Sequence, residues 1–173
     1  MKKISYMGDI PGPLNVRCPR CNGKAEYDLP FDLYAAAKGE PPGEERPLHR
    51  WGGWLVAEKY PSIKPWDGAA DGISESEGVV KCSECHLVKE HLLRWPQDAY
   101  YQWQIRGNTL WAFNVEHARV LKDFLGGKER DVTRFPQYAR SLMKMSGELL
   151  SAKVREQIGK EIEATLLREA RAP

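Results

Sequence analysis

Four cysteines in two equally spaced pairs constrain this chain more than any other feature of its sequence. Cys18 and Cys21 lie in VRCPRCNGK, and Cys82 and Cys85 lie in VVKCSECHLV. Each CxxC pair makes a tight turn that presents two thiolates, and four such ligands complete a tetrahedral Zn²⁺ site. The sequence therefore predicts that the two turns meet around one structural Zn²⁺.

The separation of the two pairs predicts an expanded zinc ribbon. The pairs are 60 residues apart, whereas the compact motif has a spacing of about 15 to 20 residues. Lengthening a flexible loop threefold costs only about 1 kcal/mol in closure entropy. Each pair is followed by a strand-like segment, KAEYDL or LVKEHLLRW. We expect the ribbon's tip to have expanded into an irregular, proline- and glycine-containing insertion, residues 28–78, in which HRWGGWLVAEKY forms one strand or a docked aromatic segment.

Two other uses of the cysteines are weaker predictions. CSECH also matches the attachment sequence of c-type haem, with His86 as the axial ligand. That reading requires export, but MKKISYMGDIPGP has no apolar run of the kind found in a signal peptide. A thioredoxin-like redox role for CPRC needs a βαβ setting that this region lacks. Zinc is favoured, and a place for His86 in the metal shell stays open.

The charge balance argues against a protein that coats nucleic acid. The 173 residues contain 26 Lys and Arg against 24 Asp and Glu, a formal net charge of +2, so any basic surface must be local. No segment approaches the roughly 20 apolar residues of a membrane helix. We therefore expect no membrane partner and a cytoplasmic location, in which thiols stay reduced.

The carboxy-terminal half predicts a hairpin followed by helices. YYQWQI and TLWAFN flank a short connection, 106–108, that contains glycine. Asn114 can cap a helix that ends at Gly126-Gly127. A second helix is expected in PQYARSLMKM and a third after Ser146, where apolar residues recur at steps of four.

These patterns predict an α+β fold, in which a zinc-bearing antiparallel sheet that includes the hairpin is covered by two or three carboxy-terminal helices. We expect a zinc-ribbon β domain over residues 1–113, with the insertion 28–78, and a helical subdomain over residues 114–173 packed on it. The last helix could also mediate homodimerisation. The expected core comprises Leu93, Trp95, Trp103, Ile105, Leu110, Trp111, Phe113, Leu121, Phe124, Leu142, Leu150, Val154 and Ile158.

CPRC and CSEC, with the strands after them, resemble the knuckles of zinc-ribbon proteins. WQIRGNTLWAFNVEHARVLKDFLGG, continuing to SAKVREQIGKEI, is similar to a loosely defined group of bacterial zinc-ribbon proteins. The resemblance covers most of residues 16–165 outside the insertion. It implies no established reaction, because zinc ribbons serve nucleic-acid contacts, protein contacts and structural support. Only the four cysteines carry over as functional positions.

The remaining candidates favour recognition over catalysis. The four histidines are scattered, with no HExxH, GxGxxG or GxxxxGK[ST] motif, and His117 beside Glu116 is interpreted as a solvent-side pair. An enzyme whose site is assembled from dispersed residues stays open. The candidate nucleic-acid contacts around the two turns are Arg17, Arg20, Lys24, Lys81 and Lys89.

The insertion is the candidate surface for a protein partner. The sequence therefore predicts a non-catalytic zinc protein that recognises nucleic acid or protein. The alternative is a subunit or accessory protein of a larger complex, with purely structural zinc.

Overall fold

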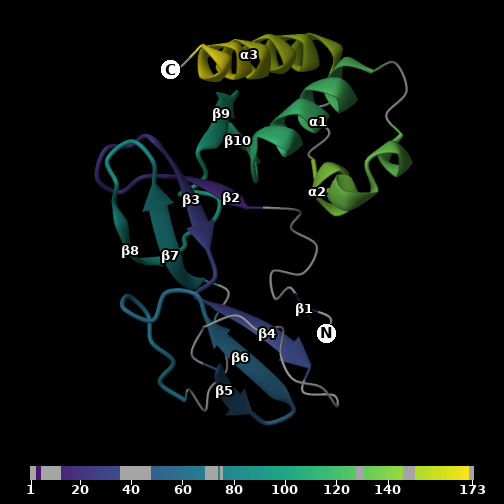
Figure 1. Ribbon diagram of the computed structural model, residues 1–173. Coiled ribbons are helices and arrows are strands. Elements are labelled where there is room, and N and C mark those ends of the chain that lie inside the picture. The colour runs from purple at the N-terminus through teal and green to yellow at the C-terminus, as the bar shows by residue number, and fades with distance from the viewer. Residues whose placement is uncertain are drawn as a thin grey trace. The chain divides into compact units, whose positions relative to one another are not determined.

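The computed structural model describes residues 3–4, 13–35, 48–68, 74, 76–127, 131–145 and 151–171. Antiparallel strands come first in the chain and helices follow them, which confirms the α+β class (Figure 1). The chain divides into two compact units, one of residues 1–8 and 17–98 and the other of residues 9–16 and 99–173. The sequence analysis placed the boundary after residue 113, whereas the structure groups the preceding hairpin with the helices. None of the described helices is both long enough and apolar enough to cross a membrane.

The cysteine turns lie on a four-stranded sheet, which we name the ribbon sheet. Its strands, in spatial order, are β2 (Leu14–Arg17), β3 (Lys24–Asp28), β7 (Glu77–Cys82) and β8 (Val88–Leu92). The antiparallel register places Ala25 opposite Cys82 and Lys81 opposite Val88. The strands predicted after each cysteine pair are confirmed as β3 and β8.

Three strands of the insertion form a second sheet together with a short strand of residues 3–4, and we name it the insertion sheet. Its strands, in spatial order, are β1 (Lys3–Ile4), β4 (Phe31–Ala35), β6 (Trp54–Glu58) and β5 (Leu48–Trp51). The expectations of an irregular insertion and of one strand in HRWGGWLVAEKY were therefore wrong. Trp51 pairs with Trp54 across a two-residue turn, and Gly52 supplies its positive φ of 55°. Phe31, Leu33 and Val56 form a small core on which three partly buried tryptophans pack.

The segment after β6 fastens the insertion to the ribbon sheet. The Tyr60 hydroxyl donates to Asp28 Oδ2 at 2.8 Å. The Lys64 ammonium donates to Glu77 Oε2 at 3.2 Å and to Glu90 Oε1 at 2.6 Å. These contacts reach β3, β7 and β8 in turn, so the insertion is tied back to the sheet that it interrupts.

The second unit contains a separate hairpin and the helices. The hairpin strands are β9 (Tyr101–Ile105) and β10 (Asn108–Ala112), and the helices are α1 (Val115–Gly126), α2 (Ala139–Met143) and α3 (Ala152–Ala170). The hairpin is a two-stranded sheet of its own, so the expectation that it lies within the zinc-bearing sheet was wrong. Arg106 and Gly107 turn the hairpin with φ of 49° and 79°, as a two-residue turn requires.

The predicted helix boundaries are partly confirmed. Asn114 accepts a hydrogen bond from the backbone N–H of His117 at the start of α1, and α1 ends at the predicted glycines. PQYARSLMKM forms a shorter helix than expected, because Pro136–Tyr138 is a 3₁₀ turn and α2 starts after it. The predicted cap Ser146 lies outside the described residues.

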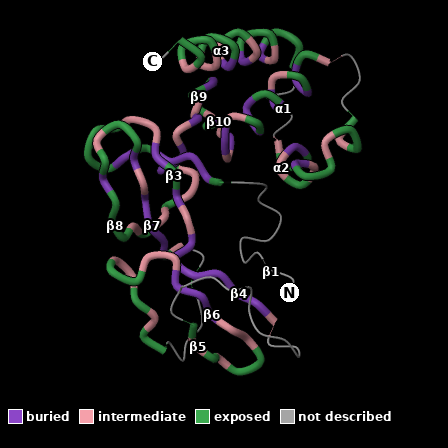
Figure 2. Tube along the Cα trace, in the orientation of Figure 1, coloured by how far each residue is buried: buried purple, intermediate pink, exposed green. Residues whose placement is uncertain are grey.

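The core of the second unit lies between the hairpin and the helices (Figure 2). The predicted core residues that are buried there are Trp103, Ile105, Leu110, Leu121, Phe124, Leu142, Val154 and Ile158. Trp111 and Phe113 are half-buried, and Leu93 and Trp95 are half-buried in the first unit. Leu150 lies outside the described residues.

Candidate metal centre

The two cysteine turns have the same backbone shape. The backbone N–H of Cys18 donates to the carbonyl of Gly23 at 2.8 Å, and that of Cys82 donates to the carbonyl of Leu87 at 2.9 Å. Each bond spans five residues. The residue that follows each pair adopts a left-handed conformation, with φ of 58° at Asn22 and 56° at His86. The shared geometry means that both turns present their sulfurs in the same way.

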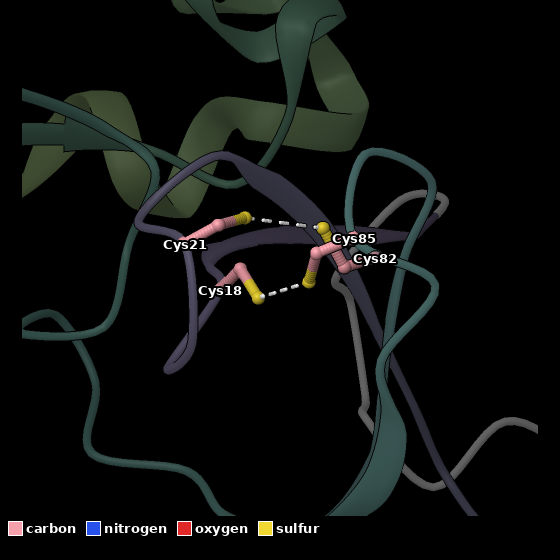
Figure 3. Close-up of side chains that lie close together, drawn as sticks. All are labelled: Cys18, Cys21, Cys82 and Cys85. Carbon is pink, nitrogen blue, oxygen red and sulfur yellow. Dashed lines mark hydrogen bonds between the residues drawn. The ribbon is translucent and has the colours of Figure 1, made fainter.

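The four sulfurs converge on one point from the two turns (Figure 3). Their Sγ atoms all lie within 4.8 Å of one another. Cys18 Sγ is 3.5 Å from Cys85 Sγ, and Cys21 Sγ is 3.6 Å from Cys82 Sγ. Sulfurs placed tetrahedrally about 2.3 Å from Zn²⁺ lie roughly 3.8 Å apart, whereas a disulfide has an S–S distance of about 2.05 Å. The arrangement thus fits a metal site, and all four cysteines are free thiols.

Backbone hydrogen bonds lower the pKa values of the Cys18 and Cys21 thiols, whereas neighbouring sulfurs raise the pKa of Cys21. Burial raises the pKa of Cys18, but hydrogen bonds from the backbone of Cys21 and Arg20 and from the Cys85 thiol together lower this pKa to about 7. The backbone N–H of Gly23 favours the Cys21 thiolate, yet partial desolvation and hydrogen bonds with the other three sulfurs raise the pKa of this exposed side chain. The pKa of Cys18 is therefore lowered while that of Cys21 is raised, because adjacent thiolates repel each other. A bound cation removes that repulsion.

Glu84 links the second turn to the first. Its Oε1 accepts a hydrogen bond from the backbone N–H of Lys24 at 3.3 Å. A Cβ atom on Gly23 would lie 2.1 Å from Glu84 Oε2, so the glycine leaves room for this contact. Sequence reasoning missed Glu84, because nothing in CSEC indicates which turn its side chain reaches. His86 is exposed and stands outside the four-sulfur group.

The five cations proposed from the sequence do not form a purely basic surface. Arg17, Arg20 and Lys89 are exposed, whereas Lys24 and Lys81 are half-buried. The Lys81 ammonium lies 5.6 Å from the centre of the Tyr60 ring and 3.9 Å from Glu26 Oε2. The same strands and turns carry an equal number of acids, namely Glu26, Asp28, Glu77, Glu84 and Glu90. The charge around the cysteines is therefore mixed.

The sequence analysis did not predict that a histidine of the second unit is buried. His117 is fully buried, and its ring stacks on Tyr138 at 4.5 Å and on Phe113 at 4.9 Å between centroids. His117 Nδ1 accepts a hydrogen bond from the backbone N–H of Phe113 at 3.2 Å. The proton of the neutral ring is therefore on Nε2, which donates to Ser141 Oγ at 3.3 Å.

This tautomer argues against a serine–histidine catalytic pair. A general base toward Ser141 would need an unprotonated Nε2, and burial lowers the pKa of His117 to about 4. The interpretation of His117 and Glu116 as a solvent-side pair was wrong. Spacing could have indicated the burial, because His117 precedes the buried Leu121 by four residues and shares its helix face.

The cysteine cluster is thus the feature of the described residues with the clearest chemistry. A tetrahedral four-sulfur site suits Zn²⁺ or iron and leaves no position for water or substrate. No family model, no curated protein and no solved structure matches the chain.

Proposed function

We propose that Cys18, Cys21, Cys82 and Cys85 hold one structural Zn²⁺, and that the chain is a zinc-ribbon protein that recognises another protein. The observation that carries the metal proposal is the convergence of four sulfurs within 4.8 Å from two turns of the same backbone shape. The ion joins segments 60 residues apart in the sequence. It therefore contributes to folding directly, as structural zinc does in small domains.

Zinc fits this site better than iron. Cys18 and Cys82 are buried, but Cys21 is exposed and Cys85 is half-buried. A redox-active ion would be open to oxidants on that side, whereas Zn²⁺ has no redox chemistry. Four thiolates also fill the tetrahedron, which favours a structural role over a catalytic one.

The charge pattern favours a protein partner over nucleic acid. Nucleic-acid binding depends on cations that neutralise phosphates, but the turns and strands that carry the five cations also carry acids, among them Glu84 in the second turn and Glu26 on β3. Lys81 is also engaged with Tyr60 and Glu26. A mixed, partly apolar surface is typical of protein contacts.

Two measurements test the proposal. Elemental analysis of the purified chain should give about one zinc per molecule, which Cys82→Ser should abolish and Ser83→Ala should retain. Iron absorbance, or a disulfide in place of metal, would contradict the zinc site.

Titration of labelled single- and double-stranded DNA and RNA across a salt series tests the partner class. We expect weak binding that Arg20→Ala leaves unchanged. Tight binding with a log–log salt slope near −0.9 per neutralised duplex phosphate, weakened by Arg20→Ala, would replace the protein partner with nucleic acid.

A further inference from the structure

The strand β8 is an exposed edge of the ribbon sheet. It pairs with β7 on one side and is the last strand in the sheet order of the described residues. Four of its five residues are exposed, and Figure 2 shows the strand as largely exposed. Val88 is 45% exposed and Leu92 is 60% exposed, and the two lie on the same face of the strand. An edge with such side chains is a site at which another strand can add.

The hydrogen-bond register shows which backbone groups face outward. The backbone N–H of Cys82 donates to the carbonyl of Leu87, and that of Leu93 donates to the carbonyl of Ser76. Inward and outward residues alternate along an antiparallel edge strand. Lys89 therefore bonds to β7, as does His91. The N–H and C=O groups of Val88, Glu90 and Leu92 point away from β7, toward the open edge.

The charges along β8 select the partner's side chains. The Glu90 carboxylate, 49% exposed, shares the single ammonium of Lys64 with Glu77. Lys81 lies opposite Val88 on this face, but its ammonium is directed to Glu26 and Tyr60. One cation, Lys64, then serves two carboxylates, which leaves the Glu90 position negative. On the other face Lys89 is exposed, while His91 Nε2 is 3.0 Å from Asp98 Oδ2. A guest strand therefore fits best with a basic residue opposite Glu90 and an acidic residue opposite Lys89.

We propose that β8 binds an extended segment of a partner protein as an added antiparallel strand. The guest segment places an apolar residue opposite Leu92 and another opposite Val88. Between them it places any residue opposite His91, a basic residue opposite Glu90 and an acidic residue opposite Lys89. Its backbone satisfies the outward N–H and C=O groups, and its apolar residues cover Val88 and Leu92. This inference rests on the proposed function, since it names the partner and the surface that binds it.

A second copy of this chain fits the edge poorly. Antiparallel pairing of two β8 strands about Glu90 would place Glu90 opposite its own equivalent. It would also place Lys89 opposite His91, which offers Lys89 no acid. Like charges directly opposite each other destabilise a strand pair. The charge pattern therefore favours a different protein as the occupant.

Fluorescence anisotropy with two labelled peptides tests the proposal. The matched peptide is Thr-Ile-Thr-Lys-Glu-Val-Thr, and the swapped peptide, Thr-Ile-Thr-Glu-Lys-Val-Thr, reverses the two charges. We expect the zinc-loaded chain to bind the matched peptide about tenfold more tightly than the swapped one. Hydrogen exchange should show new protection of the amides of Val88, Glu90 and Leu92 when the matched peptide is added.

Two variants and one control complete the experiment. Glu90→Pro removes an outward N–H without removing a bond to β7, and Leu92→Asp removes an apolar contact, so each should weaken binding at least about tenfold. Leu167→Asp changes a side chain of similar exposure, 52%, on α3 and should leave binding unchanged. Circular dichroism and zinc content verify the fold of each variant.

The outcomes separate this inference from the proposed function. Equal affinity for the two peptides, or no binding at about millimolar peptide, would overturn the β8 site, and zinc in the same samples would leave the metal proposal intact. Peptide binding with the expected preference by a chain that holds no zinc would support the edge and contradict the metal site.

Discussion

Acidification should destabilise the second unit through His117. Its ring is buried and neutral, and burial lowers its pKa to about 4, compared with about 6.5 for an unfolded histidine. The unfolded chain binds the proton more tightly, so the contribution of His117 to stability is complete above pH 6.5. It is lost progressively as the pH falls from 6.5 toward 4. Between pH 7 and pH 5 the two pKa values give a loss of about 2 kcal/mol in the free energy of unfolding.

The measurement compares the wild-type chain with His117→Phe. The substitution preserves a flat ring between Phe113 and Tyr138 but removes the bonds to the Phe113 N–H and to Ser141, so it should cost about 1–3 kcal/mol at pH 7. Urea unfolding gives the free energy of unfolding at pH 7 and at pH 5. The decrease between the two pH values should be about 2 kcal/mol larger for the wild type than for the variant. Acid effects at the cysteines are common to both chains and cancel. A His117 titration midpoint near 6.5 by NMR, or equal acid sensitivity of the two chains, would refute the reasoning.

Two further predictions concern the first unit. A Cβ atom on Gly78 would lie 2.4 Å from the buried Tyr27 ring, so Gly78→Ala should destabilise the chain by about 1–3 kcal/mol in thermal or urea unfolding. Gly53→Ala, with no atom within 4 Å of the added carbon, should change stability little, and similar effects of the two would contradict the packing of β3 on β7. Asp98 accepts three hydrogen bonds, two of them from Arg94. Asp98→Asn should cost about 1–3 kcal/mol at pH 7, and an unchanged midpoint in urea would show that these bonds contribute nothing net.

The four candidate metal ligands could be predicted because their signal is local. Two equal CxxC spacings indicate four candidate ligands whatever lies between them, and the structure brings the four sulfurs together. The symmetry of the two turns was less visible. Asn and His adopt positive φ more often than most residues, so Asn22 and His86 are compatible with the left-handed conformation that both adopt, but neither residue type specifies it.

The insertion sheet could not be predicted in the same way. Its strands are short, and β4 pairs with β1 and β6, which are distant in sequence. Asp32 and Tyr34 lie on the face opposite Phe31 and Leu33, yet all four are buried. The alternation that identifies a half-exposed strand is therefore lost. Proline and glycine between the strands correctly indicated turns. The sequence analysis extended that interpretation to all of residues 28–78 and so predicted an irregular segment.

The β8 edge shows the limit of pattern reading most clearly. LVKEHLLRW correctly predicted a strand. The register of β8 on β7, with Glu77 opposite Leu92, decides which backbone groups of β8 face solvent. The sequence of β8 alone does not specify this register. The five predicted nucleic-acid contacts stay a prediction, and acids on the same strands and turns, such as Glu84 and Glu90, make the charge around them mixed.

X-ray absorption at the zinc K-edge of the purified chain tests the central claim most directly. Four cysteine ligands predict a single shell of four sulfurs at about 2.3 Å from the ion. Loss of one ligand in Cys82→Ser should remove the ion or replace one sulfur with a lighter scatterer. A wild-type spectrum with a nitrogen or oxygen ligand at about 2.0 Å, or a chain that folds its ribbon sheet with no metal bound, would contradict the structural four-cysteine site.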